Sequence, residues 1–102
     1  MNLTQDDSGR RLTVRVGETV TVVLAENPTT GYRWHPDVDL TKLEQVDDRY
    51  DGPAQPRGAP GSRRLTFRPS QSGPVRLRVV LQRSWEQTHI GEFDVDLDVT
   101  QP

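Results

Sequence analysis

The sequence contains no cysteine, which excludes disulfides, thiolate metal sites and a cysteine nucleophile. It also lacks any apolar run approaching the roughly 20 residues that a membrane-spanning helix needs. Neither sign of charge dominates, because 13 Lys and Arg are interspersed with 15 Asp and Glu, for a net charge of −2. No basic patch is therefore available for nucleic acid or an anionic membrane, and we expect neither as a partner.

The length of the chain bounds its organisation. A chain of 102 residues can bury one hydrophobic core but not two, so residues 1–102 are expected to form a single domain. Residues 2–7 are polar and acidic, unlike a signal peptide. The compartment stays open: a native chain that begins further upstream would fit the periplasm or secretion, and otherwise the cytoplasm is expected.

Apolar and polar residues alternate along most of the chain, the period-two pattern of β-strands. Seven strands are predicted, within residues 11–16, 19–24, 32–34, 43–50, 63–68, 75–81 and 93–99. Turn-forming residues separate them, and no segment predicts a helix. This pattern indicates an all-β, immunoglobulin-like β-sandwich of seven to eight mostly antiparallel strands.

The last two strands have the clearest pattern and predict a hairpin. Antiparallel pairing with Leu81 opposite Phe93 gathers the apolar residues on one face and sets Arg78 against Asp96 on the other. A slip of one residue would turn the apolar row towards water, so we expect this register to be well specified. The connecting loop would then span residues 83–91.

Three loops should meet at one end of the sandwich. If successive strands run up and down, every second connection returns to the same pole. These connections are residues 26–31, 51–62 and 83–91, which also have the most unusual compositions. Their convergence would create one composite surface.

The first loop has the residues of a rigid turn. Asn27 can accept a hydrogen bond from its own loop, Pro28 fixes φ, and Gly31 allows the positive φ needed at the exit. Thr29 and Thr30 then form a stiff, uncharged tip able to enter a cleft without burying a charge. Taken alone, the loop could equally be a well-formed connection.

The other two loops differ in what they offer. The second contains a glycine-rich stretch, residues 58–61, that allows close backbone approach, although such loops usually only connect strands. The third contains Trp85, for which the alternation gives no core position, and an exposed Trp is a frequent interface hot spot. The alternative is a structural Trp folded under its loop. By contrast, Trp34 lies on a central strand and is expected in the core.

Together the three loops resemble the three ordered motifs of the chagasin-like inhibitors of cysteine peptidases. The motif residues are Asn27, Pro28, Thr29, Thr30, Gly31 and Tyr32, followed by Trp34; then Gly58, Ala59, Pro60 and Gly61; then Arg83, Ser84 and Trp85. The resemblance spans nearly the whole chain, and the first motif is the most specific. Ser84 stands where the family usually has Pro, and Pro60 where it usually has Gly. These departures bear on potency and preference more than on function.

The resemblance implies a reversible, tight-binding inhibitor with no catalytic residue, metal or cofactor. Its partner would be a papain-like, cathepsin L-type cysteine protease, and we expect it to act as a monomer. The Thr29-Thr30 tip would enter the active-site cleft beside the catalytic cysteine and histidine. The second loop would lie along the non-primed subsites, and Arg83 with Trp85 would pack on the primed side.

Two other functions stay open from the residues alone. An immunoglobulin-like module could bind carbohydrate or another protein through Trp85. A hydrolase could use Ser84 as nucleophile and His89 as base. The two residues are only five positions apart on one flexible loop, which is a weak arrangement for catalysis. His35 is expected to be a surface residue at a strand end, and the acidic pairs in turns are too sparse for a metal site.

Overall fold

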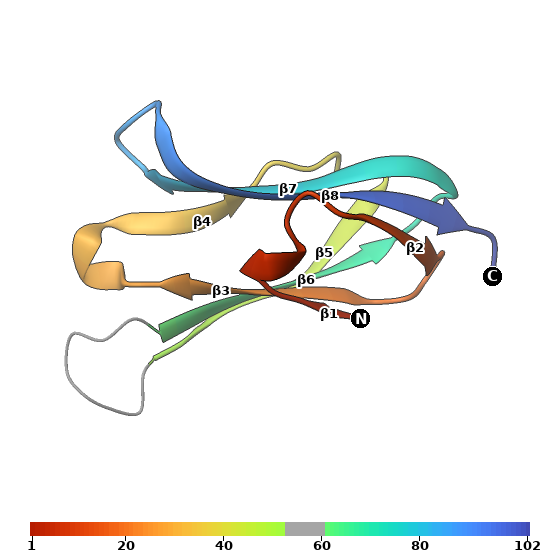
Figure 1. The fold of residues 1–102 in the computed structure, drawn as a ribbon, viewed down its shortest axis with the longest axis horizontal. Coiled ribbons are helices and arrows are strands. Elements are labelled where there is room, and N and C mark those ends of the chain that lie inside the picture. Colours follow the sequence, from red (N-terminus) through yellow and green to blue (C-terminus); the bar gives the residue numbers. More distant parts are fainter. Residues whose placement is uncertain (53–60) are drawn as a thin grey trace.

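The computed structural model describes residues 1–52 and 61–102 and consists of two β-sheets packed face to face (Figure 1). The strands are β1 (Asn2–Leu3), β2 (Arg11–Arg15), β3 (Val20–Glu26), β4 (Tyr32–Pro36), β5 (Leu43–Asp51), β6 (Gly61–Pro69), β7 (Gly73–Arg83) and β8 (His89–Thr100). Two short 3₁₀ helices are η1 (Gln5–Asp7) and η2 (Pro28–Thr30). The sheet orders are β1-β3-β6-β5 and β2-β8-β7-β4. The predicted all-β sandwich is confirmed.

The core lies between the sheets and consists of the apolar residues that alternate along the strands. Its buried members are Leu3, Val14, Val20, Val22, Leu24, Trp34, Leu43, Leu65, Phe67, Leu77, Val79, Phe93, Val95, Leu97 and Val99. Trp34 is 6% exposed, and its indole Nε1 donates to the Ala25 carbonyl at 2.9 Å. The predicted core position of Trp34 is therefore confirmed.

The N-terminal segment contributes to both sheets. β1 pairs in parallel with β3 in one sheet, and β2 pairs in parallel with β8 in the other. The remaining ladders are antiparallel. Sequence analysis missed β1 because two residues are too few to show an alternation, although Leu3 is buried in the core.

The register of the β7–β8 hairpin corrects the prediction. Phe93 pairs with Val79 instead of Leu81, and Asp96 pairs with Arg76 instead of Arg78, so the strands are shifted by two residues. A two-residue shift keeps every side chain on its predicted face, which is why alternation could not detect it. The strands also extend further than expected, with a bulge beside Leu81, and the loop is confined to residues 84–88.

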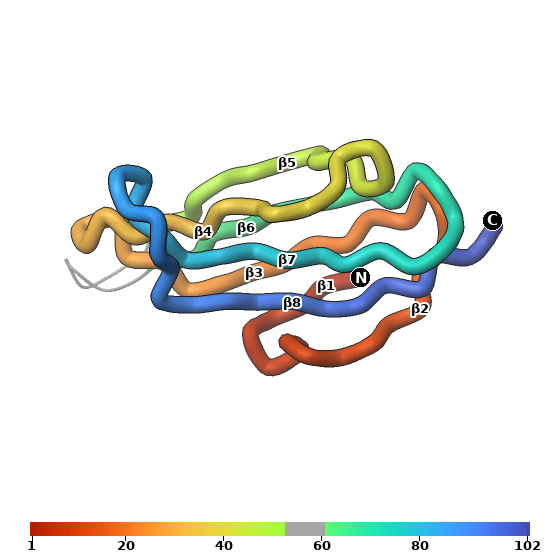
Figure 2. The backbone as a smooth tube through the Cα atoms, turned by 90° about the horizontal axis from the view of Figure 1, so that it is seen from above, coloured from red at the N-terminus to blue at the C-terminus, as the bar shows by residue number. Residues whose placement is uncertain are grey.

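The β3–β4 and β7–β8 loops lie at one end of the sandwich, together with the strand ends that flank the third predicted loop, as the sequence predicts. Tyr32 pairs with Arg83 in one sheet, while Glu26 pairs with Gly61 in the other, so the strand ends flanking all three loops lie together. Figure 2 shows the β3–β4 and β7–β8 loops at this end and the C-terminus at the other. We call this end, comprising residues 27–31 and 84–88, the loop pole. No helix within the described ranges is long and apolar enough to span a membrane.

Candidate functional site

The β3–β4 loop is closed by its own side chains. Asn27 Oδ1 accepts hydrogen bonds from the Thr29 backbone N–H at 3.1 Å and from the Thr29 hydroxyl at 2.7 Å. The Thr30 hydroxyl donates to the Asn27 carbonyl at 2.8 Å and accepts from the Tyr32 N–H at 3.2 Å. The turn predicted for Asn27 is confirmed. The hydroxyls of Thr29 and Thr30 form hydrogen bonds inside the loop and hold its shape, a role that was not predicted from the sequence. The end of the tip therefore presents the two threonine methyl groups and no charged group.

Gly31 and Trp85 bring the first and third loops into contact. Gly31 has φ +80°, so the prediction that it supplies the positive-φ exit is confirmed. A Cβ added there would lie 2.8 Å from Trp85 Cη2, so the indole edge rests against bare backbone. Trp85 nevertheless remains 71% exposed, which excludes the interpretation in which it folds under its loop.

Arg83 ties these two loops together. Its guanidinium lies over the Tyr32 ring at 4.3 Å from the centroid, and its Nε donates to the Thr30 carbonyl at 3.1 Å. Its Nη1 also pairs with Glu86 at 3.1 Å. The cation–π contact and the hydrogen bonds of Arg83 thus hold the two loops in a fixed relative position. The predicted contact of Arg83 and Tyr32 with a peptidase stays a prediction.

The β7–β8 loop contains no proline and is held by hydrogen bonds of its own. The Gln82 side chain donates to the Glu86 carbonyl at 2.6 Å, and the Glu86 N–H donates to the Arg83 carbonyl at 3.1 Å. These bonds close a turn around Ser84 and Trp85. The loop is therefore held in place without the rigidity that a proline would add.

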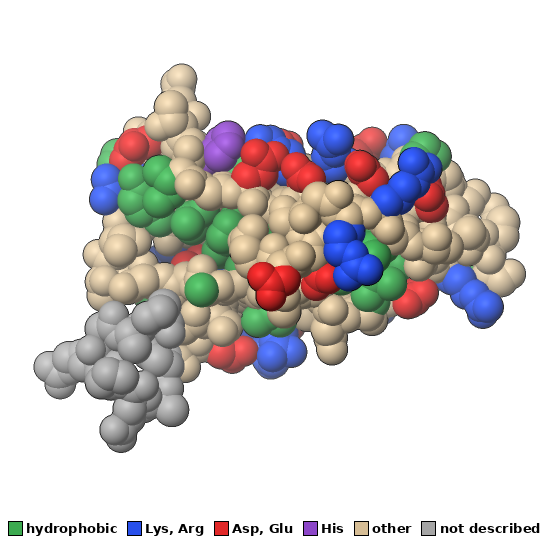
Figure 3. All heavy atoms as spheres, viewed as in Figure 1, with side chains coloured by type: hydrophobic (Ala, Val, Ile, Leu, Met, Phe, Trp, Pro, Cys, Tyr) green, Lys and Arg blue, Asp and Glu red, His purple; other side chains and the backbone are tan. Residues whose placement is uncertain are grey.

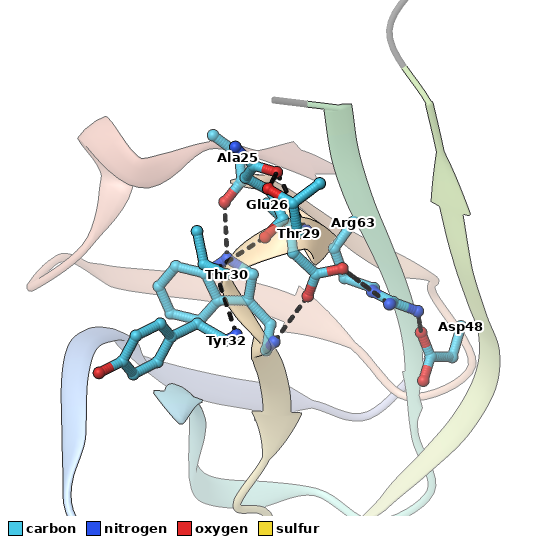
Figure 4. Close-up of polar contacts among 9 residues, drawn as sticks. Ala25, Glu26, Thr29, Thr30, Tyr32, Asp48 and Arg63 are labelled. Carbon is cyan, nitrogen blue, oxygen red and sulfur yellow. Dashed lines mark hydrogen bonds and ion pairs between the residues drawn. The ribbon is translucent and has the colours of Figure 1, made fainter. Parts of the chain in front are cut away.

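A buried ion pair lies at the base of the tip, and sequence analysis missed it. Glu26 ends β3, and its side chain is 0% exposed. Its Oε2 accepts two hydrogen bonds from Arg63, from Nε at 3.0 Å and Nη2 at 2.7 Å, while Oε1 accepts the Trp34 N–H at 2.8 Å (Figure 4). Arg63 Nη1 also donates to Asp48 at 2.9 Å. One cluster thereby joins β3, β4, β5 and β6.

The buried charges of this cluster are stable only when every partner is present. Burial opposes the charged guanidinium of Arg63, but the hydrogen bonds to Glu26 and Asp48 outweigh that effect and raise its pKa. A buried carboxylate without such partners would be strongly unfavourable. The signal in the sequence was a charged residue at 26 on the inward-facing positions of an otherwise apolar strand. Residue 26 is the first residue of the predicted loop 26–31, whereas in the structure it is the last residue of β3.

The second loop is only partly described. The predicted contacts Gly58, Ala59 and Pro60 lie outside the described residues. Gly61 is buried at the start of β6, and a Cβ there would lie 2.5 Å from the Tyr50 hydroxyl and would also collide with the Asp51 carbonyl. The close approach of β5 therefore explains this glycine, and its contact with a peptidase stays a prediction.

The candidate hydrolase residues are not arranged for catalysis. Ser84 and His89 line one open hollow with His35, but no hydrogen bond joins Ser84 to His89 in the described residues, so the contact between nucleophile and base that a hydrolase needs is missing there. His89 Nε2 lies 3.7 Å from Glu92 Oε2. Residues 1–52 and 61–102 contain no group of three His, Asp or Glu side chains able to hold a metal. Figure 3 shows charges of both signs intermingled along the sandwich and hydrophobic side chains gathered towards the loop pole.

Comparisons with known proteins agree with this geometry. The model of the chagasin family peptidase inhibitors, I42, matches residues 13–98. Amoebiasin-1 of Entamoeba histolytica is 31% identical over 88 residues, covering 83% of this chain and 84% of that protein.

Three solved structures share the fold. The cysteine protease inhibitor EhICP2 of Entamoeba histolytica has a TM-score of 0.89 at 19% identity, covering 97% of this chain and 94% of its own. Amebosin has a TM-score of 0.82 at 26% identity, covering 98% and 97%. PbICP-C, solved in complex with falcipain-2, has a TM-score of 0.58 at 19% identity, covering 99% and 98%. The extent of the family match and the identity to Amoebiasin-1 show that this chain belongs to the chagasin family of cysteine peptidase inhibitors and is not an enzyme.

Proposed function

We propose that the loop pole reversibly inhibits papain-like, cathepsin L-type cysteine peptidases by filling their active-site cleft. The observation that carries this proposal is the coupling of an uncharged, locked tip at Thr29-Thr30 to the exposed indole of Trp85 through Gly31 and Arg83. A surface that holds a projecting tip and an exposed aromatic side chain rigidly together is complementary to a groove such as an active-site cleft. The relative PbICP-C, solved with falcipain-2, supports a peptidase as the partner.

The tip is preorganised for entry into a cleft. Both threonine hydroxyls and the Thr29 backbone N–H already have hydrogen-bond partners within the loop, so binding does not have to order the loop, and the tip carries no charge that binding would bury. Rigid loops lose little conformational entropy on association. Tight binding from an interface of ordinary size, about 1,600 Å², is therefore reasonable.

The same geometry protects the inhibitor from cleavage. The carbonyls of Asn27 and Pro28 accept hydrogen bonds from the N–H groups of Thr30 and Gly31, at 3.2 and 3.1 Å. These carbonyls face into their own turn and are not presented to an attacking thiolate. Misorientation of the reacting atoms forfeits most of the advantage that proximity gives a peptidase. The tip occludes the cleft without becoming a substrate.

The three loops divide the contact. The β3–β4 tip would lie beside the catalytic cysteine and histidine, the β7–β8 loop with Trp85 on the primed side, and residues 58–61 along the non-primed subsites. One monomer would bind one peptidase. The β5–β6 loop would contribute mainly backbone contacts, because its predicted residues carry little side-chain bulk.

The test is titration of the protein into papain, with residual activity followed on a fluorogenic peptide and chain integrity followed by mass spectrometry. We expect stoichiometric inhibition, recovery of activity on dilution and an uncleaved inhibitor. Absence of inhibition at micromolar concentration would contradict the proposal and favour a sandwich module that binds another ligand. Progressive cleavage within residues 27–31 would contradict the protection argument alone.

A further inference from the structure

Arg33 is an exposed cation beside the loop pole. It lies on β4 next to the inward-facing Trp34, so it projects from the outer face of its sheet. Within the described part of the chain Arg33 forms no ion pair, whereas Arg83 pairs with Glu86 and Arg78 with Glu92 and Asp37. The neighbouring arginines are thus neutralised internally, whereas the charge of Arg33 has no counterpart among residues 1–52 and 61–102.

A hollow of about 320 Å³ lies between the two described loops at this point. Its lining residues are Pro28, Gly31, Arg33, His35, Ser84 and Trp85. Pro28 and Trp85 provide apolar walls, while Arg33 and Ser84 provide hydrogen-bond donors. None of the described residues that line the hollow is a carboxylate, so none of these side chains repels a negative charge. We call this hollow the Arg33 niche.

We infer that the Arg33 niche receives the carboxylate of an Asp or Glu side chain from the rim of the target peptidase's cleft. A guanidinium presents a planar fork that matches a carboxylate with two hydrogen bonds, and the Ser84 hydroxyl can donate a third. The exposed indole beside it reduces the access of water to the pair. Net charge complementarity therefore favours an acidic side chain over a neutral or basic one.

The niche belongs to the surface that the proposed function brings to the peptidase, and the inference rests on that function. Trp85 forms one wall of the niche and is also the proposed anchor on the primed side. Docking of the indole would bring the cleft rim over Arg33. The niche thus selects among papain-like peptidases by the charge of one rim position, while the tip and the indole provide binding common to all of them.

The test compares Arg33→Gln and Arg33→Glu with wild type against papain and a panel of papain-like peptidases. A charge at the edge of an interface changes mainly the association rate, and a partly exposed ion pair contributes little energy. We therefore expect Arg33→Gln to raise the inhibition constant only about three- to tenfold, for at least one inhibited peptidase. Arg33→Glu should raise it by more than about tenfold. Arg15→Gln is the matched control, since Arg15 is exposed, unpaired in the described residues and located at the opposite end of the sandwich. It should leave inhibition unchanged.

The carboxylate itself is identified on the peptidase. Each rim Asp or Glu of the most affected peptidase is changed to the amide, and we expect one change to abolish the difference between wild type and Arg33→Gln. The inference is overturned if Arg33→Gln matches wild type within about twofold for every inhibited peptidase, or if no rim carboxylate couples to Arg33. A wild-type protein that inhibits no peptidase would overturn the proposed function, and the inference with it. These outcomes are distinct.

Discussion

Arg63 donates two hydrogen bonds, at 3.0 and 2.7 Å, to one carboxylate oxygen of Glu26. Glu26 is the residue directly before the loop that carries the tip. The other oxygen of Glu26 holds the Trp34 N–H in the opposite sheet. The base of the tip is therefore positioned by a buried polar contact between the two sheets, in addition to apolar packing.

Removal of Glu26 should be costly. Glu26→Ala leaves the guanidinium of Arg63 without its main partner and the Trp34 N–H without an acceptor, so we expect a loss of about 3–5 kcal/mol in the free energy of unfolding. Urea denaturation measures this loss. Asp96→Ala, which breaks the exposed pair with Arg76, should cost less than about 1 kcal/mol. Equal losses for the two variants would show that the buried pair has no special structural role.

Gly31→Ala should weaken inhibition. Alanine is strained by about 1–2 kcal/mol at φ +80°, and its Cβ would also displace the Trp85 indole. Gly9→Ala is a matched control, because Gly9 has φ +90° but nothing within 4 Å of an added Cβ. Both variants should lose similar stability in thermal unfolding, and only Gly31→Ala should raise the inhibition constant of the peptidase assay. Similar inhibition by both would exclude a role for the indole contact.

The two tryptophans should separate binding from stability. Trp85→Ala removes an exposed anchor and should cost about 2 kcal/mol of binding, a factor of about 30, with unfolding unchanged. Trp34→Ala removes a core side chain and should cost about 3–5 kcal/mol of folding stability. Inhibition kinetics and thermal unfolding of both variants give the comparison. If Trp85→Ala inhibits as well as the parent, the proposed role of the third loop is wrong.

Acid should destabilise the fold through Asp39. Hydrogen bonds from the Thr41 hydroxyl, at 2.6 Å, and from the Thr41 N–H, at 3.0 Å, hold the pKa of Asp39 below its ordinary value of 3.8. The unfolded chain therefore binds this proton first as the pH falls. The stabilisation is present above pH 3.8 and is lost as the pH falls through the folded pKa.

Urea denaturation between about pH 5 and pH 2 measures this effect. The pKa values of Asp7 and Asp98 are also lowered, the first mainly by the Thr4 N–H and then by Arg10, the second by Arg11, so wild-type stability should decline on acidification. Asp39→Asn should make the decline shallower. A decline of the same steepness in Asp39→Asn would contradict the contribution assigned to Asp39.

The alternation of apolar residues was sufficient to predict the class of fold, the faces of the strands and the core position of Trp34. It was insufficient for the register of β7 and β8, because a shift of two residues leaves both faces unchanged. The turn at Asn27 and the positive φ at Gly31 were predictable because both follow from local chemistry. The hydroxyl contacts of Thr29 and Thr30 required the backbone path of the loop.

The sequence by itself determined the sandwich, the uncharged tip and an indole without a core position, since all three follow from local pattern and residue type. Only the tertiary structure decided that Trp85 rests on Gly31, that Arg83 joins the loops, and that Glu26 is buried against Arg63. These contacts join residues 37 to 54 positions apart. The order of the strands predicts that the loops share one pole, but which side chains touch there depends on how the loops and strand ends pack in three dimensions, and no local pattern encodes that packing.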